Sequence, residues 1–130
     1  MFIHNIKLQP SPVHGLGVFV LEKISQGEPV YRHRWKLDLQ LTSKKFFRLD
    51  PRDQAFILHH GALDRRVNRY CLPYDNLRFL NHSDTPNLQF DPATDQIIAL
   101  RDIRAGEELL QDYGEFEDNV ETRLGRKETT

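Results

Sequence analysis

The densest group of chemically active side chains lies at residues 78–87. It combines a charge, an aromatic ring, amides, an imidazole and hydroxyls in the run Arg-Phe-Leu-Asn-His-Ser-Asp-Thr-Pro-Asn. The Pro-Asn bend prevents a helix from continuing, and the side chains offer hydrogen-bond donors and acceptors to the polar edge of a small ligand. The alternative is a polar turn that matches an Asn-x-Ser glycosylation signal by coincidence.

Two further segments carry chemistry of their own. At residues 14–17 the sequence His-Gly-Leu-Gly leads directly into a β-branched and aromatic run, which is typical of a tight turn before a strand. It lacks the third glycine and the helix of a dinucleotide-binding fingerprint. Residues 102–114 predict a turn and a short strand that ends on Tyr113, between an acid and a glycine. Taken alone, Tyr113 is an aromatic residue at a strand end with its hydroxyl in water.

In this order and spacing, the three segments resemble the SET-domain family of protein-lysine methyltransferases. That family carries a Gly-x-Gly loop, an Arg-Phe-x-Asn-His-Ser-x-x-Pro-Asn segment and a Gly-Glu-Glu-Leu-x-x-Asp-Tyr-Gly segment, all present within residues 14–114. The resemblance implies a mostly β fold of the β-clip type, with a short helical insertion and a C-terminal pseudoknot. It also implies one SET domain over residues 1–130, with a variable insertion at about 36–69 and a short tail at 115–130.

The resemblance further implies transfer of a methyl group from S-adenosyl-L-methionine to a lysine side chain of a protein, for example a basic histone-like or ribosomal protein. Tyr113 would be the catalytic residue, orienting the sulfonium and the methyl group rather than acting as a strong base. The cofactor would be bound by His14, Gly15, Leu16, Gly17, Phe79, Asn81, His82, Tyr113 and Phe116. The lysine channel would be lined by Phe90 and Gln111, and the ring of Phe90, which has no hydroxyl, would favour di- or trimethylation.

Cys71 is the only cysteine, so one chain can build neither a disulfide framework nor a cysteine-based zinc site. Many SET enzymes place one zinc-binding cysteine inside the Asn-His-Ser segment, where this chain has Asp84. We therefore expect a minimal domain that needs no metal. A nucleophilic triad of Cys71, His82 and Asp84 is conceivable from residue types, but we expect Cys71 to be a small buried hydrophobe. The short tail suggests that a second chain completes the cofactor pocket in a homodimer.

Composition restricts the other possibilities. The chain has 130 residues, 38% of them hydrophobic, and a formal net charge of −1, which is typical of one globular domain. The sequence has neither a signal-peptide core nor an apolar run of membrane-spanning length, so we expect an intracellular protein, cytoplasmic or nuclear. Two alternatives stay open. The first is a catalytically idle SET-like peptide-binding module. The second is a small nucleic-acid-binding protein that uses ten Lys or Arg at residues 31–69, although the net charge argues against it.

Strands and one helix must position these segments. Strands are expected at residues 2–8, 17–23 and 29–35, and a hairpin at residues 88–100. Asp50 before Pro51 predicts the start of a helix of about ten residues that ends near His59 and His60, which face different sides and make a poor metal pair. Residues 18–30 are echoed at a constant offset by residues 97–109, so two similar strand-turn units should bracket the domain. Seven acids at residues 107–121 are expected to attract a basic peptide.

Overall fold

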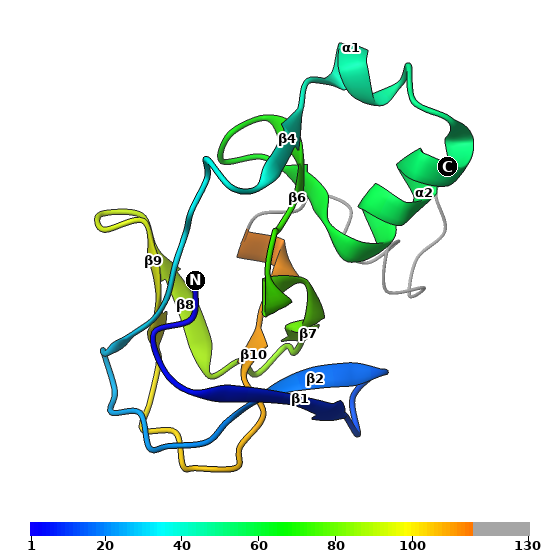
Figure 1. Cartoon of the computed structure of the whole chain (residues 1–130). Coiled ribbons are helices and arrows are strands. Elements are labelled where there is room, and N and C mark those ends of the chain that lie inside the picture. Colours follow the sequence, from blue (N-terminus) through cyan, green and yellow to red (C-terminus); the bar gives the residue numbers. More distant parts are fainter. Residues whose placement is uncertain (116–130) are drawn as a thin grey trace.

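Strands dominate the structure, and its two helices gather at one end. This computed structural model describes residues 1–115 of the chain. The strands are β1 (Ile6–Pro10), β2 (Leu16–Val20), β3 (Pro29–Arg32), β4 (Leu39–Leu41), β5 (Ala62–Asp64), β6 (Arg69–Leu72), β7 (Asn81–His82), β8 (Leu88–Asp91), β9 (Gln96–Ala99) and β10 (Leu110–Gln111). The helices are α1 (Ser43–Phe46) and α2 (Pro51–His60), with 3-10 turns η1 (Asn76–Phe79) and η2 (Tyr113–Glu115). Figure 1 shows α1 and α2 beside β4 and β6, with the other sheets below. The expected mostly β fold with a short helical insertion is confirmed.

The strands form four small sheets. Strands β1 and β2 form an antiparallel pair. The strands within the sheets β3-β9-β8 and β4-β6-β5 are also antiparallel, whereas β7 and β10 form a parallel pair. The β8–β9 hairpin is confirmed. All three strands expected in the N-terminal part are shorter than predicted, and the second ends at Val20 instead of residue 23. The first begins only at Ile6, because Phe2 instead bridges to Tyr31, and the third ends at Arg32, where the ring of His33 stacks on that of Trp35.

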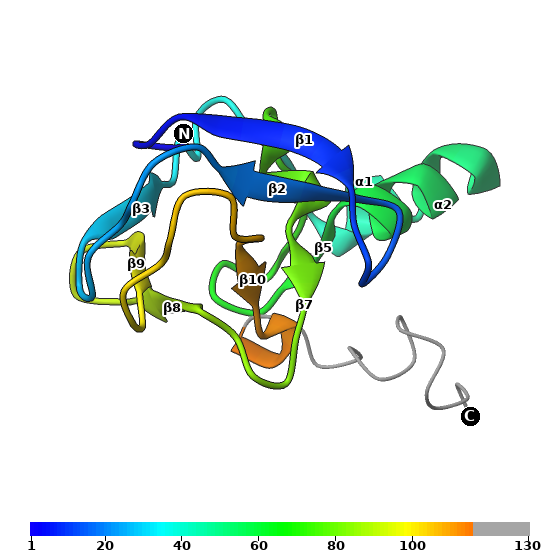
Figure 2. The same cartoon turned by 90° about the horizontal axis from the view of Figure 1, so that it is seen from below.

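The parallel pair brings two of the three sequence segments side by side, as Figure 2 shows for β7 and β10. Leu110 lies opposite Asn81, and Gln111 lies opposite His82. The Asn87 side chain fixes this junction, because its amide donates to the Glu108 carbonyl and its oxygen accepts from the Leu110 amide, both at 2.8 Å. The threading of the chain into a pseudoknot stays a prediction.

The two similar units at residues 18–30 and 97–109, which we call the echoed units, pair with each other through equivalent contacts. Ile24 and Ile103 exchange both backbone hydrogen bonds, at 2.9 and 2.8 Å. The Gly27 amide donates to the carbonyl of residue 99 at 2.8 Å, and the equivalent amide, that of Gly106, donates to the carbonyl of residue 20 at 2.7 Å. Both glycines adopt a positive φ, +84° and +91°, which favours glycine in these turns. The two units therefore have equivalent structures as well as similar sequences, and each one provides hydrogen-bond partners for backbone groups of the other.

Two apolar cores hold the sheets and helices. The larger core is formed mainly by the two units at residues 18–30 and 97–109, and its buried members are Val18, Val20, Ile24, Val30, Tyr31, Leu80, Leu88, Ile97, Ala99, Ile103 and Leu109.

 The smaller core lies under the helices, where the rings of Phe46 and Tyr70 stack at 3.7 Å against Ile57 of α2.

Helix α2 forms where the sequence predicts it. The Asp50 side chain caps its start by accepting from the Arg52 amide at 2.8 Å, and Pro51 occupies the first turn, where its missing amide costs nothing. The helix ends at His60, and the next amide, that of Gly61, still donates to the Ile57 carbonyl. Within residues 1–115, no helix is long and apolar enough to cross a membrane.

Candidate functional site

A cleft of about 620 Å³ opens between the glycine loop, the end of α2 and the residues around β7. We call it the cleft, and its walls are formed by Val13, His14, Gly15, Leu16, Leu58, His59, His60, Arg78, Phe79, Asn81, His82 and Tyr113. Seven of the residues expected to bind a cofactor are in this list. Gly17 is not among the lining residues, and Phe116 lies outside the described part of the chain. The three sequence segments therefore meet at one hollow.

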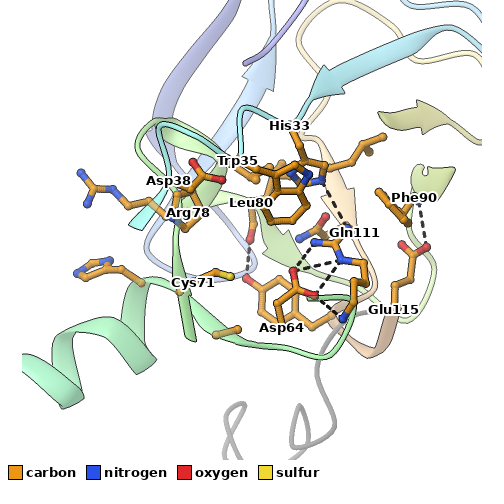
Figure 3. A pocket seen from close by; sticks show the side chains of 18 residues that line it. His33, Trp35, Asp38, Asp64, Cys71, Arg78, Leu80, Phe90, Gln111 and Glu115 are labelled. Carbon is orange, nitrogen blue, oxygen red and sulfur yellow. Dashed lines mark hydrogen bonds and ion pairs between the residues drawn. The ribbon is translucent and has the colours of Figure 1, made fainter. Parts of the chain in front are cut away.

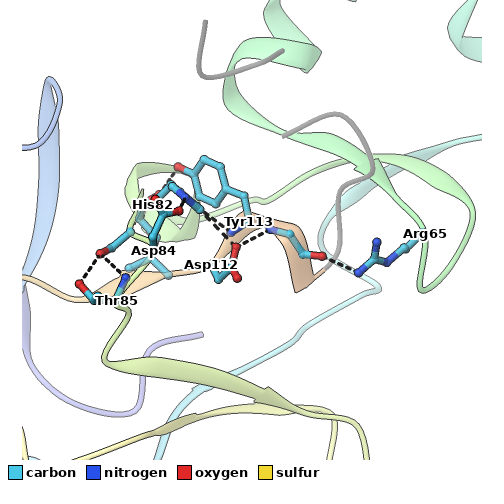
Figure 4. A network of polar contacts seen from close by, with 9 residues as sticks. Arg65, His82, Asp84, Thr85, Asp112 and Tyr113 are labelled. Carbon is cyan, nitrogen blue, oxygen red and sulfur yellow. Dashed lines mark hydrogen bonds and ion pairs between the residues drawn. The ribbon is translucent and has the colours of Figure 1, made fainter. Parts of the chain in front are cut away.

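His82 is held from both ring nitrogens, as Figure 4 shows. Its Nδ1 accepts the Tyr113 amide at 3.0 Å, so this nitrogen carries no proton. The proton must then sit on Nε2, which lies 2.8 Å from Asp84 and donates to its carboxylate. This hydrogen bond connects β7 to the backbone of Tyr113, and it therefore helps to hold the tyrosine side chain in place.

Asn81 connects the glycine loop to the C-terminal segment. Its side-chain amide lies within hydrogen-bond distance of the carbonyls of His14 and Leu16, at 3.0 and 3.2 Å, and of the Glu108 carboxylate at 2.9 Å. The hydroxyl of Ser11 donates to the same carboxylate at 2.7 Å. The buried Asn81 amide and the half-buried Glu108 carboxylate therefore order the loops that they join.

Gly17 is needed because of Glu108. A side-chain carbon at Gly17 would overlap with the Glu108 carboxylate, whereas one at Gly15 would meet nothing within 4 Å. Gly15 instead has a positive φ of +48°. The two glycines therefore serve different purposes: one turns the chain, and the other leaves room for a carboxylate.

A second, narrow cavity of about 70 Å³, shown in Figure 3, also has Tyr113 in its wall. We call it the narrow cavity. Its walls include Phe90 and Gln111, the two residues expected to line a lysine channel, together with His33, Trp35, Asp64, Arg66, Cys71, Leu80 and Glu115. Both predicted channel residues are therefore brought to one cavity.

Arg66 forms one wall of the narrow cavity. Its guanidinium carbon lies 4.4 Å from the ring centroid of Phe90 and 5.4 Å from that of Trp35. Buried Asp64 binds it through both carboxylate oxygens, with distances of 2.6 to 3.1 Å. Burial, and then the charge of Arg66, lower the pKa of neighbouring His33 to about 4. His33 is therefore neutral at pH 7.

Two further acidic groups of this cavity are shifted toward their neutral forms. Glu115 accepts the Phe90 amide at 3.0 Å, but burial raises the pKa of its carboxyl. Burial also raises the pKa of the Cys71 thiol to about 12, so the thiolate needed for nucleophilic attack is scarce. Because both nitrogens of His82 already have partners, a triad of Cys71, His82 and Asp84 is not supported, and Cys71 is the buried hydrophobe that its sequence context predicts.

The four described acids of the run at residues 107–121 have partners inside the fold, and that of Asp112 is the Gly114 amide, at 2.8 Å. The other three bind groups farther along the chain. Glu107 pairs with Arg101 at 2.9 Å, Glu108 binds Ser11 and Asn81, and Glu115 binds the backbone of strand β8. These three carboxylates therefore stabilise the site, in addition to any attraction that they exert on a basic peptide.

Tyr113 lies in the partition between the two hollows, because it belongs to the walls of both. Its hydroxyl donates to the Leu80 carbonyl at 2.5 Å, and its amide is held by His82. His60 and Arg78 also belong to both walls. The cleft and the narrow cavity are therefore neighbours that share part of their walls.

Comparison with known families agrees with this arrangement. The family model described as the SET domain matches residues 15–114. The chain belongs to the SET domain family. Its mostly β architecture is the SET fold that the sequence segments implied.

Two relatives place this SET domain among known proteins. It is 25% identical over 123 residues to a histone-lysine N-methyltransferase, H3 lysine-4 specific, of Mycosarcoma maydis. That match covers 84% of this chain but only 8% of the relative. A crystal structure of a Plasmodium falciparum protein described as a candidate histone methyltransferase has a TM-score of 0.57 and 23% identity, over 85% of this chain and 94% of that one. At this identity the structural likeness shows the fold.

Sequence reasoning missed several residues of the SET site. His59 and His60 were expected to cap and solvate a helix end, but both line the cleft. Arg66 and Trp35 carry no sequence signal of a site, because only folding of the insertion brings Arg66 to the rings of Trp35 and Phe90. Glu108 lies within the Gly-Glu-Glu-Leu segment, and that motif was the one available indication that it mattered.

Metal ligands were not expected, and none are grouped in the described SET domain. Within residues 1–115, no three His, Cys, Asp or Glu side chains gather so as to hold an ion. Metal independence itself stays a prediction.

Proposed function

We propose that this SET domain transfers a methyl group from S-adenosyl-L-methionine to a lysine side chain of a protein substrate. The position of Tyr113 in the walls of both the cleft and the narrow cavity carries the proposal. A methyl donor and an amine must approach in line for displacement at carbon, and two neighbouring hollows that share a wall at Tyr113 support such an approach. The family and the names of its relatives support the same class of reaction.

The cleft fits the methyl donor in size and chemistry. It is open to a ligand with an aromatic base and an amino-acid arm, since its walls combine the Phe79 ring, polar Asn81 and the backbone around Gly15. When bound, the donor supplies a methyl group on a positively charged sulfur, which is a good leaving group. The chain then has to bind, to orient and to exclude water, and the ties from Asn81 and His82 fix the loops that would do so.

The narrow cavity suits a lysine amine that must lose its proton. A protonated amine has no lone pair for attack, and burial among apolar and aromatic groups lowers the pKa of a lysine. Leu80, Phe90 and the Tyr113 ring would provide this environment. In this proposal the Tyr113 hydroxyl orients the methyl group, and the substrate is a lysine in a basic segment, of the kind found in histone-like or ribosomal proteins.

Incubation of the protein with labelled S-adenosylmethionine and an array of lysine peptides tests the function. We expect label on lysine-containing peptides alone and a mass increase of one or more methyl groups. Replacement of the target lysine by arginine in the same peptide is the matched control. A protein that binds S-adenosylmethionine and peptide but never transfers label would instead be the idle peptide-binding module.

A further inference from the structure

Glu115 places an acid in the wall of the narrow cavity, where the proposed function puts the target lysine. It belongs to the same 3-10 turn as Tyr113, and Figure 3 shows its carboxylate directed toward Phe90. One oxygen, Oε2, accepts the Phe90 amide at 3.0 Å. Within residues 1–115 the other oxygen, Oε1, accepts no hydrogen bond. This second oxygen is therefore available to a group that enters the cavity.

The other two carboxylates of the cavity wall are placed differently. Asp64 is buried, and both of its oxygens bind the Arg66 guanidinium at distances of 2.6 to 3.1 Å. Figure 3 shows Asp38 on the opposite side of the cavity from Phe90 and Glu115. Among the described acids, Glu115 is therefore the one that adjoins the expected lysine channel and is not already bound to a guanidinium.

The surroundings of Glu115 leave its carboxyl able to gain a proton. Burial raises its pKa, the Phe90 amide and the charge of Arg66 lower it, and the charge of Asp112 raises it. The ring of His33 meets that of Phe90, but His33 is neutral at pH 7 and adds no charge there. An acid whose pKa is raised toward neutral pH accepts a proton more readily than an ordinary carboxylate does.

A lysine side chain arrives in the narrow cavity as an ammonium ion, which has no lone pair for attack on a methyl group. There it would meet the carboxylate of Glu115, and the two charges would be poorly solvated among Leu80, Phe90 and the Tyr113 ring. Transfer of one proton converts this ion pair into a neutral amine and a neutral carboxyl. Because both charges disappear, surroundings of low polarity favour the transfer.

We infer that Glu115 accepts the proton of the target lysine before the methyl group is transferred. The assignment rests on the proposed function and deepens it, since it gives the proton a destination at Oε1 of Glu115. An N–H bond of the ammonium breaks, its electron pair stays on nitrogen, and an O–H bond forms on the carboxyl. The amine then attacks the methyl group, and Glu115 returns its proton to water before the next turnover. Tyr113 keeps its orienting role.

The pH dependence of methyl transfer by the whole chain tests this role, with Glu115→Gln as the variant. The amide oxygen of glutamine can still accept the Phe90 amide, but it takes up no proton. We expect kcat/KM for a lysine peptide to fall by about 100-fold at pH 7, the effect of losing a general base. In the variant kcat/KM should then rise about tenfold per unit between pH 7 and 9, because the neutral fraction of a lysine with a pKa near 10.4 rises by that factor. The wild type should change much less over the same range.

A second substrate separates proton transfer from packing. A peptide with aminoethylcysteine in place of the target lysine keeps the length of the side chain, but its sulfur withdraws electrons and makes the ammonium more acidic. We expect Glu115→Gln to lose less activity on this peptide than on the lysine peptide at pH 7. If Glu115 only fastened the chain to strand β8, the losses would be equal on both peptides and at both pH values. Equal losses would therefore overturn its role as proton acceptor.

Glu22→Gln is the matched control, because the Glu22 carboxylate also accepts one backbone amide, that of Asn5, at 3.0 Å, and it lines neither hollow. This variant should keep the wild-type rate at both pH values. Calorimetry should show unchanged S-adenosylmethionine affinity in Glu115→Gln, since Glu115 does not line the cleft. If Glu115→Gln does not fold, Glu115→Ala replaces it with the same expected recoveries at pH 9 and on aminoethylcysteine.

Two outcomes separate the role of Glu115 from the proposed function. A wild-type protein that binds S-adenosylmethionine but transfers no methyl group to any lysine peptide would overturn the proposed function, and the role of Glu115 with it. An active wild type whose Glu115→Gln variant is equally active at pH 7 would overturn the role of Glu115 alone.

Discussion

Tyr113 has two separate attachments, and they allow its hydroxyl to be tested apart from its ring. Tyr113→Phe keeps the backbone bond to His82 and the ring in the partition, but it removes the donor to the Leu80 carbonyl. We expect kcat to fall by about 100-fold or more, on the order of 3 kcal/mol, with S-adenosylmethionine affinity nearly unchanged. Single-turnover methyl transfer and calorimetry measure the two quantities. Tyr74→Phe, outside both hollows, is the matched control, and near-normal turnover in Tyr113→Phe would remove Tyr113 from the catalytic role.

Gly17 offers a test of the contact between the glycine loop and Glu108. Gly17→Ala should push the Glu108 carboxylate away from Asn81 and Ser11, and we expect a loss of about 1 to 3 kcal/mol in the free energy of unfolding. Urea unfolding measures it. The double variant Gly17→Ala/Glu108→Ala should lose less than the sum of the two single variants, because the overlapping group is gone. Additive losses would show that the overlap is relieved in some other way.

His33 should make stability depend on mildly acidic pH. Burial, followed by the charge of Arg66, lowers its pKa from 6.5 to about 4 in the folded state. Between these values the unfolded chain binds more protons, so stability is full above pH 6.5 and is lost as the pH falls toward 4. Urea unfolding at pH 7 and at pH 5 should show the loss, and His33→Gln should show less of it. Equal pH slopes in the two proteins would contradict the assignment to His33.

At the residue scale, the sequence identified most residues that line the cleft but few of those that line the narrow cavity. Asn81, His82 and Tyr113 belong to motifs that fold into one cleft, so their proximity could be predicted. The pairing of Arg66 with Phe90 could not, because it depends on how the insertion packs. The same holds for Glu115, whose place in the wall of the narrow cavity is visible only after the walls are assembled.

At the scale of the elements, the turns at Gly27 and Gly106 allow the same substitution to be compared at two equivalent positions. Gly27 and Gly106 have similar positive φ values and equivalent backbone bonds. Gly27→Ala and Gly106→Ala should therefore each destabilise the fold by about 1 kcal/mol, and by similar amounts, since alanine is strained at such a φ. Thermal or urea unfolding measures the two losses. Clearly unequal losses would show that the equivalence is confined to geometry.

The elements that carry a strong local pattern were predictable. Helix α2 follows from the Asp50 cap and Pro51, and the β8–β9 hairpin follows from polar turn residues between two apolar runs. The parallel pair β7–β10 was not foreseeable from periodicity, because each strand has only two residues and its partner is distant in the sequence. Its expectation came from the family resemblance, which implied that these two segments thread together.

At the scale of the whole molecule, the expected independence of metal gives a clear experiment. The single cysteine and Asp84 at the position often held by a zinc ligand motivate it. Chelators should leave both the melting temperature and methyl transfer unchanged, and elemental analysis should find no stoichiometric zinc. Activity that disappears in EDTA and returns with zinc would contradict this prediction. An intracellular location and a homodimer that completes the cleft also stay predictions, the latter open to a measurement of molecular mass in solution.

The mutual pairing of the two echoed units has a consequence for synthesis on the ribosome. Residues 18–30 emerge first, but the groups that satisfy them, at residues 97–109, follow about 80 positions later, a delay of roughly 4 to 16 seconds at common elongation rates. During that interval Ile24 and Gly27 have no native acceptor or donor. The nascent chain therefore cannot complete this domain step by step from its N-terminus, and most of it must leave the exit tunnel before the two halves can join.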